Sequence, residues 1–278
     1  MAVVFRARDV RLGRMVALKV MAPAVSADAA FRQRFARESQ AAAAVDHPHI
    51  IPVYEADETD GVLFIAMRYV PGGDVRSLVD RDGPLSARRA AAIISPVASA
   101  LDAAHAAGLI HRDVKPGNML IDMQPGRPDH VYLSDFGLSK ASECSIGLTG
   151  TGQFLGTLNY SAPEQIEGGS VDGRTDQYAL ACAAYELLTG APPFLRDSAT
   201  AVMCAQLSEP PPRPSIVRSD LPLAADQVFE RALAKTPHHR YASCREFADA
   251  FRVACRLASY DPDHDARRPR AHPPTQIA

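Results

Sequence analysis

The sequence has few cysteines, and their arrangement excludes two common classes of small protein. The 278 residues contain five of them: Cys144, Cys182, Cys204, Cys244 and Cys255. They are odd in number, widely spaced and form no C-x-x-C pair, so neither a disulfide framework nor a zinc knot is expected. The pattern favours a reducing compartment, and we expect the chain to be cytoplasmic.

The chain also lacks an excess of charge and a long hydrophobic run. Thirty Lys and Arg against 32 Asp and Glu give a formal net charge of −2, so nucleic acid and acidic membrane surfaces are not expected partners. The N-terminal residues have no signal-peptide pattern, and the most apolar stretch, residues 90–101, is too short to cross a bilayer. We therefore expect no membrane span.

Lysine is scarce, because it supplies only four of the 30 basic residues: Lys19, Lys115, Lys140 and Lys235. A chain so biased towards arginine should keep lysine where a compact ammonium is needed, although chance placement gives the same count. Apolar residues, in contrast, make up 47% of the chain and charged residues 22%. This composition supports a sizeable core, in one large domain or two small ones.

Hydrophobic periodicity changes at about residue 70. Before it, we predict a helix from Ser26 or Asp28 to residue 45, and strands over residues 2–7, 15–21, 50–54 and 62–70, with an acidic turn over 55–61. After it, we predict helices over residues 86–107, 175–188 and 223–234, and short strands over 119–122 and 131–133. Residues 258–278 have no apolar period, so we expect a disordered tail.

Lys19 lies inside an apolar strand pattern, Val-Ala-Leu-Lys-Val, over residues 16–20. Glu38 follows Phe35 by three residues, which places its carboxylate near the apolar face of the predicted helix. A buried unpaired charge is costly, whereas two opposite charges on adjacent elements satisfy each other. We therefore predict an ion pair between Lys19 and Glu38. The alternative is that both side chains extend separately to solvent.

Residues 110–120 concentrate polar side chains between a helix end and a strand start. Asp113 and Asn118 offer acceptor oxygens, and Arg112 and Lys115 offer cations a few residues away. Asp135 follows the next apolar run and precedes Phe-Gly. Oxygen ligands with nearby cations suit a phosphate and Mg²⁺ site better than a zinc site.

These segments stand in the order of the protein-kinase signature set: V-A-L-K, the helix Glu, H-R-D-x-K-x-x-N, D-F-G and A-P-E. Residues 1–257 resemble the bacterial eukaryotic-type serine/threonine protein kinases, including those of actinobacteria. The resemblance implies an α+β, bilobal fold. A small antiparallel-sheet N-lobe with one main helix would cover residues 1–70, and a larger, mostly helical C-lobe would cover residues 71–257.

The resemblance implies transfer of the γ-phosphoryl group of ATP to Ser or Thr hydroxyls of protein substrates. Asp113 would accept or orient the hydroxyl proton, and Lys115 would steady the transferred group. Lys19, held by Glu38, would contact the α- and β-phosphates. Thr157 would bond the catalytic Asp and Lys.

The resemblance also assigns cofactor sites. Asn118 and Asp135 would hold Mg²⁺ or Mn²⁺. The ATP site would be lined by Val4, Ala17, Lys19, Met67, Tyr69, Val70, Asp74 and Leu120. For the apolar members of this set, ordinary core packing remains the alternative.

Regulation is implied by the arginine beside Asp113. In kinases with this residue, Arg112, a phosphate on the activation loop commonly pairs with it. Thr149 and Thr151 are the expected phosphorylation sites, with the alternative that both are only small loop residues. Glu164 and Arg240 resemble a buried structural ion pair.

Asp176 matches the family's aspartate in a helix of the C-lobe. Some relatives form an N-lobe dimer, so a homodimer is among the partners that the resemblance allows.

The sequence departs from the family pattern at its start. A Gly-rich loop should precede the strand that holds Val4, and the 15 residues from Val4 to Lys19 match a chain that begins just after that loop. Without it, ATP should bind more weakly. Three alternatives remain: an active kinase whose recorded start is too late, a truncated kinase with weak activity, and a non-catalytic pseudokinase acting as an interaction module. The intact catalytic and metal-ligating residues argue against the last.

Overall fold

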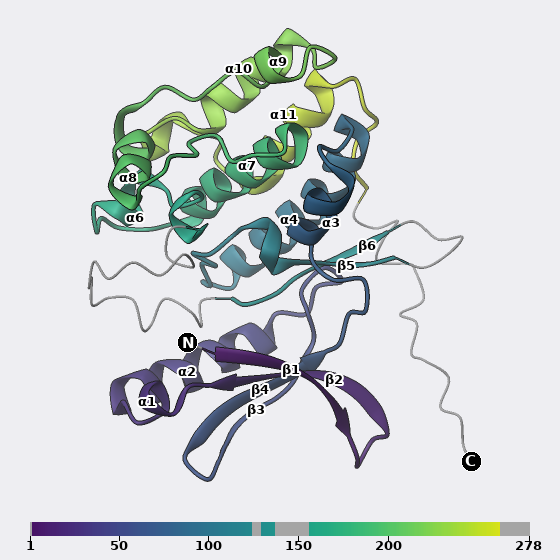
Figure 1. The fold of residues 1–278 in the computed structure, drawn as a ribbon, viewed down its shortest axis with the longest axis vertical. Coiled ribbons are helices and arrows are strands. Elements are labelled where there is room, and N and C mark those ends of the chain that lie inside the picture. The colour runs from purple at the N-terminus through teal and green to yellow at the C-terminus, as the bar shows by residue number, and fades with distance from the viewer. Residues whose placement is uncertain (1, 124–128, 137–155, 262–278) are drawn as a thin grey trace.

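Four antiparallel strands and a helix form the N-lobe. The computed structural model describes residues 2–123, 129–136 and 156–261 (Figure 1). Its larger sheet has the spatial order β1 (Ala2–Asp9), β2 (Arg14–Met21), β4 (Val62–Arg68) and β3 (Val53–Thr59). Asp9 sets the first turn, because its Oδ1 accepts the backbone N–H groups of Arg11 and Leu12, both at 3.1 Å. The two predicted strands at the start of the chain are therefore confirmed, and they pair as an antiparallel hairpin.

The prediction for the third strand was wrong. Residues 55–59 belong to β3 and are not a turn. β3 lies at the edge of the sheet and most of its side chains are exposed, so its polar residues show no alternation that marks a strand. Ile50 and Ile51, which were expected in that strand, are buried and reach the C-lobe, where the Ile51 N–H donates to the Leu133 carbonyl at 2.9 Å.

Helix α2 (Ala29–Ala44) follows the short α1 (Pro23–Ser26) and packs on the sheet (Figure 1). Asp28 caps α2, since its side chain accepts the N–H groups of Ala30 and Phe31. The shared core is small and consists of Met21, Phe31, Phe35, Leu63 and Ile65. The N-lobe is thus held by far fewer buried side chains than the C-lobe.

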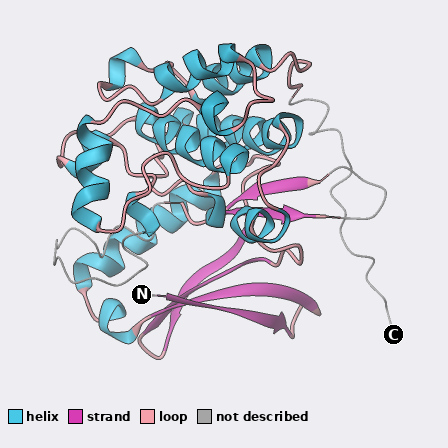
Figure 2. Cartoon of the chain, turned by 45° about the horizontal axis from the view of Figure 1, so that its top comes forward, coloured by secondary structure: helices cyan, strands magenta, loops and turns pink. Residues whose placement is uncertain are grey.

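The C-lobe is mostly helical (Figure 2). Its elements are α3 (Val75–Asp82), α4 (Ala87–Ala106), η1 (Pro116–Asn118), β5 (Met119–Asp122), β6 (His130–Leu133), α6 (Pro163–Ile166), α7 (Gly173–Thr189), α8 (Ala199–Ser208), α9 (Pro214–Val217), α10 (Leu223–Ala232), η3 (Pro237–His239) and α11 (Cys244–Ala254). The three predicted helices and both short strands are present. Within the described ranges, no helix has the length and apolar character needed to cross a membrane.

Helices α4 and α7 form the centre of the C-lobe, and α11 packs on both. Alanine is frequent at their buried positions, which lets the helix backbones approach closely. The α7 side chains are buried nearly throughout, from Thr175 to Leu188. This rigid core carries the loops described below. Residues 262–278, most of the predicted tail, lie outside the described residues.

Candidate active site

The segment from His111 to Asp113 is fixed by a buried carboxylate on α7. Asp176 is fully buried, and its two oxygens accept the backbone N–H groups of His111 at 2.8 Å and Arg112 at 2.7 Å. Arg112 has a φ of 66°, a conformation costly for a residue with a side chain and kept only where its surroundings impose it. Asp176 therefore holds the loop in the shape that presents Asp113.

Asp113 lies at the centre of a hydrogen-bonded cluster. Its carboxylate oxygens accept from Lys115 Nζ at 3.0 and 2.8 Å and from Asn118 Nδ2 at 3.1 Å. Lys115 Nζ also donates to Thr157 Oγ1 at 3.3 Å. The side chains of Asp113, Lys115 and Asn118, which come from one motif, and of Thr157, which comes from a distant segment, thus lie together. A carboxylate beside an ammonium provides a proton acceptor and a cation at one place.

Asp135 is positioned by strand β6 and by its neighbours. The Ser134 hydroxyl donates to the Asn118 carbonyl at 3.1 Å, and the Phe136 ring packs against His111 with centroids 4.6 Å apart. His111 Nε2 lies 2.9 Å from the Ser134 carbonyl oxygen. Asp135 itself has a φ of 63°, again a conformation imposed by its surroundings. His111, Ser134 and Phe136 are positioning residues that the motif analysis did not assign.

The predicted ion pair between Lys19 and Glu38 is absent. Lys19 Nζ instead donates to Asp135 Oδ1 at 2.7 Å. Glu38 Oε2 is buried without a hydrogen-bond partner, and burial raises the pKa of this carboxyl despite the opposing effect of Arg112. The prediction placed both charges near the core, which is correct. It failed on the partner, because the sequence does not show how α2 is rotated relative to β2.

Most residues predicted for the adenine site lie together. Met67 and Val70 belong to one buried cluster, with Ala17 and Leu120 packed against it. Tyr69 lies between Met67 and Val70 in the stretch that follows β4.

The two remaining residues predicted for the ATP site are Asp74 and Val4. The Asp74 side chain caps α3 by accepting the Ser77 N–H. The Asp74 backbone pairs with the backbone of Leu120. Val4 stands opposite Lys19 in the β1–β2 register and is 56% exposed.

Glu164 and Arg240 form a bidentate buried ion pair, with both N–O distances 2.8 Å. Arg240 also donates to the carbonyls of Ala234, Arg174 and Lys235. Burial raises the pKa of Glu164, but the bonds from Arg240 outweigh it and the pKa lies below its usual value. The pair anchors α6, whose Gln165 donates to the Arg112 carbonyl at 3.1 Å.

The predicted phosphorylation sites Thr149 and Thr151 lie outside the described part of the chain. Lys140, for which no role was predicted, also lies outside it. Lys235 had no predicted role. Its Nζ donates to the Ala205 carbonyl at 3.1 Å and lies 4.0 Å from the centre of the Phe194 ring, which indicates a structural role.

The side-chain oxygens of Asn118 and Asp135 suit a divalent cation that prefers oxygen ligands. Asn118 uses its amide nitrogen to bond the Asp113 carbonyl at 2.7 Å, which leaves its carbonyl oxygen as the acceptor. Asp135 provides a carboxylate. An amide oxygen with a carboxylate fits Mg²⁺ or Mn²⁺ and does not suit zinc.

Known proteins share this arrangement of motifs and lobes. The chain is 45% identical over 250 residues to the serine/threonine-protein kinase PknH of Mycobacterium tuberculosis, which covers 90% of this chain and 38% of PknH. It is 42% identical over 265 residues to PknE of the same organism, covering 95% and 46%. The chain therefore spans less than half the length of these relatives.

A solved structure gives the same result for the fold. The crystal structure of the M. tuberculosis PknI kinase domain matches with a TM-score of 0.74 and 40% identity, covering 92% of each chain. The family model described as the protein kinase domain matches residues 1–251. With its bilobal fold and its ordered motifs, the chain belongs to the protein kinase family.

Proposed function

We propose that the chain transfers the γ-phosphoryl group of ATP to serine or threonine hydroxyls of proteins. One observation carries the proposal: the Asp113 carboxylate accepts hydrogen bonds from Lys115 and Asn118, and Lys115 also bonds Thr157. Relatives named serine/threonine-protein kinases support it. The kinase unit would occupy residues 1–257.

Each side chain has a task that its position allows. Asp113 would accept or orient the proton of the substrate hydroxyl, and Lys115 would steady the transferred phosphoryl group. Lys19 would contact the α- and β-phosphates. Asn118 and Asp135 would hold Mg²⁺ or Mn²⁺, which when bound neutralises phosphate charge. Phosphoryl transfer depends mainly on positioning and charge stabilisation, so cations and oxygen ligands are the required groups.

Regulation would act through Arg112. Its side chain is exposed and makes no hydrogen bond or ion pair with other described residues, so a phosphate could pair with it. We propose autophosphorylation at Thr149 or Thr151. Peptide mass spectrometry after incubation with Mg·ATP tests this, and the proposal fails if neither threonine is modified.

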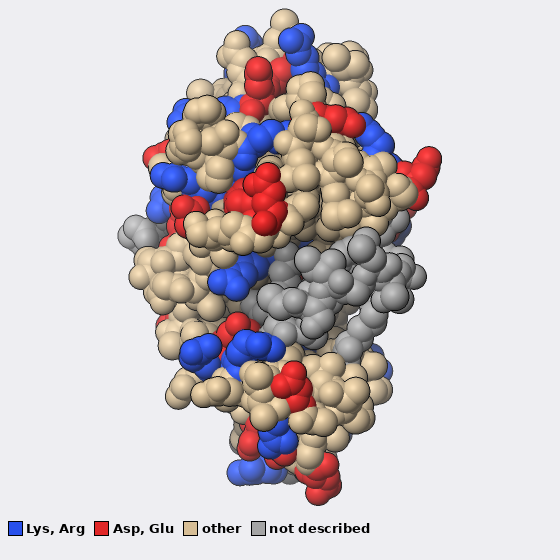
Figure 3. All heavy atoms as spheres, turned by 90° about the vertical axis from the view of Figure 1, so that its left-hand side faces the viewer, with Lys and Arg blue, Asp and Glu red and all other residues tan. Residues whose placement is uncertain are grey.

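The partners of this activity would be proteins with accessible Ser or Thr, in a reducing, ATP-supplied compartment such as the cytoplasm. The cysteines in the described ranges are free thiols, in keeping with that environment. On the face shown in Figure 3, acidic and basic side chains are interspersed.

The decisive experiment is transfer of radiolabelled γ-phosphate to a generic Ser/Thr protein. Asp113→Asn removes the proton acceptor but keeps the volume, so we expect the rate to fall about 10²–10⁴-fold. Asp220→Asn, at an exposed position that belongs to none of these motifs, is the matched control and should keep the wild-type rate. Equal signals from wild type and Asp113→Asn would overturn the proposal and favour a pseudokinase.

A further inference from the structure

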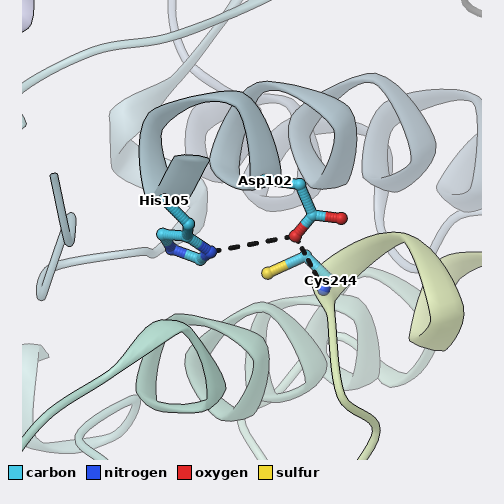
Figure 4. Close-up of side chains that lie close together, drawn as sticks. All are labelled: Asp102, His105 and Cys244. Carbon is cyan, nitrogen blue, oxygen red and sulfur yellow. Dashed lines mark hydrogen bonds and ion pairs between the residues drawn. The ribbon is translucent and has the colours of Figure 1, made fainter. Parts of the chain in front are cut away.

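Three side chains of metal-ligating type meet on the C-lobe where α4, α7 and α11 come together. Asp102 and His105 lie on α4, and Cys244 begins α11. Their ligand atoms all lie within 4.8 Å of one another. Figure 4 shows the three side chains pointing towards a common point, with the sulfur between the ring and the carboxylate. None of them belongs to the proposed phosphoryl-transfer site.

The hydrogen bonds of His105 determine which of its ring nitrogens is available. Nε2 lies 2.7 Å from Asp176 Oδ2, and an ionised carboxylate only accepts, so Nε2 carries a proton. In the neutral ring, Nδ1 then carries a lone pair. Nδ1 lies 3.8 Å from Asp102 Oδ1, which is also an acceptor. A cation between these two acceptors, either a second proton on the ring or a metal ion, would satisfy both of them.

The local packing keeps this geometry fixed. Asp102 is held by the start of α11, because its two oxygens accept the backbone N–H groups of Cys244 at 2.9 Å and Arg245 at 3.0 Å. Gly173, at the start of α7, lies against the His105 ring, and a Cβ there would come within 2.6 Å of Nδ1. The ring is therefore confined between α7 and the other two ligands.

We propose that Asp102, His105 and Cys244 form a binding site for Zn²⁺ or a similar borderline-soft divalent cation. A sulfur, an imidazole nitrogen and a carboxylate oxygen are the ligand types that zinc prefers, whereas Mg²⁺ and Ca²⁺ select oxygen alone. Tetrahedral zinc with these bond lengths separates its ligand atoms by about 3.3–3.6 Å, so the three ligand atoms, which lie within 4.8 Å of one another, would move closer together on binding. Water would supply the fourth ligand, since the Asp102 and His105 side chains are 21% and 15% exposed.

Asp176 completes the site as an outer partner. Metal-ligating histidines usually donate their other N–H to a carboxylate, which fixes the ring and raises its basicity. His105 already makes this bond to Asp176. Metal binding must overcome one cost, the deprotonation of the Cys244 thiol. Burial raises the pKa of this thiol, and the metal must displace its proton, which leaves to solvent.

Titration of the metal-free chain with Co²⁺, in the absence of nucleotide, tests the proposal. A cysteine ligand gives a thiolate-to-cobalt charge-transfer band, which the oxygen ligands Asn118 and Asp135 cannot produce. We expect the band to saturate at one equivalent, to disappear on addition of Zn²⁺ and to persist in excess Mg²⁺. Zn²⁺ at 100-fold excess over its Kd should raise the Tm by about 5–10 °C.

Variants assign the ligands. Cys244→Ser should lose the band and the Tm shift, while Cys204→Ser, an exposed cysteine outside the cluster and the matched control, should keep both. If Cys244→Ser does not fold by far-UV circular dichroism, Asp102→Asn replaces it, because the amide keeps an acceptor oxygen for one of the two α11 N–H groups. It should weaken Zn²⁺ binding at least 10-fold. No saturable band, or a band that survives both variants or is lost in a control, would overturn the proposal.

Discussion

The two lobes hold their parts of the proposed active site in different ways. In the C-lobe, Asp113, Lys115 and Asn118 bond one another, and Asp176 fixes the loop that carries them. In the N-lobe, Lys19 reaches across to Asp135, and the Glu38 carboxylate has an oxygen without a partner. The side chains of the C-lobe part are hydrogen-bonded to one another, whereas the N-lobe part includes an unpaired carboxylate oxygen.

The cores below the two parts explain the difference. The loop that carries Asp113 packs on α4 and α7, whose side chains are largely buried. Helix α2 contributes Phe31 and Phe35 to a cluster of only five buried residues, so fewer buried contacts fix its position. A contact between rigid neighbours is fixed by the fold, whereas a contact between elements that can shift depends on what binds between them. Four predictions probe this comparison.

The largest effect is expected where the C-lobe part is braced by a buried ion pair. Arg240→Met leaves Glu164 as an uncompensated buried charge, so the free energy of unfolding should fall by about 3–5 kcal/mol. Chemical denaturation measures this. Glu164→Gln in the Arg240→Met background removes the stranded charge and should recover part of the loss. A change below about 1 kcal/mol for Arg240→Met would contradict the role of the pair.

A smaller effect, on activity alone, is expected in the N-lobe part. Glu38→Gln removes a carboxylate that the ligand-free structure leaves unpaired, so stability should hardly change. If Glu38 pairs with Lys19 only when nucleotide occupies the site, phosphoryl transfer should fall about 10–100-fold, the value of a charge-assisted hydrogen bond. Glu55→Gln, on an exposed position of β3, makes the same charge change outside the site and is the matched control. A stability loss with unchanged kinetics would place Glu38 in the fold and not in the site.

The same difference limits what the sequence predicts. Asp113, Lys115 and Asn118 lie within six residues, so their local contacts follow from one loop motif. The partner of Lys19 depends on the position of a separate helix, which no local pattern encodes. β3 was misplaced because an exposed edge strand needs no apolar alternation. The His105 bond to Asp176 joins residues 71 apart, and only the packing of α4 on α7 brings them together.

Acid should loosen the connection between the lobes. His47 lies in the segment after α2, and its Nδ1 accepts the His49 N–H at 3.2 Å while Nε2 lies 3.2 Å from Ser99 Oγ on α4. Burial, followed by repulsion from His49, lowers the pKa of His47 from 6.5 to about 4, against the attraction of Asp46. The folded state therefore binds a proton less readily than the unfolded state, and stability should fall as pH drops from about 6.5 to about 4.

Thermal unfolding at pH 7 and pH 5 measures the contribution of His47. Allowing for solvent screening, we expect it to account for about 1 kcal/mol at pH 5. His47→Gln keeps a hydrogen-bonding side chain without the titration, so its drop in Tm between the two pH values should be smaller than that of the wild type. Identical drops would remove His47 from the lobe connection.

The smallest effect should come from Lys235, a half-buried cation of the C-lobe with no carboxylate in ion-pair distance among the described residues. Burial lowers its pKa to about 8, so Lys235→Met removes a desolvation cost together with one hydrogen bond to Ala205. These terms oppose each other, and the free energy of unfolding should change by less than about 1 kcal/mol. Phosphoryl transfer should be unaffected, whereas Lys115→Met should abolish it. If Lys235→Met and Lys115→Met lost activity equally, removing either lysine charge of the C-lobe would be enough to stop phosphoryl transfer. The contacts made by the Asp113 and Asp176 carboxylates would then not explain the activity.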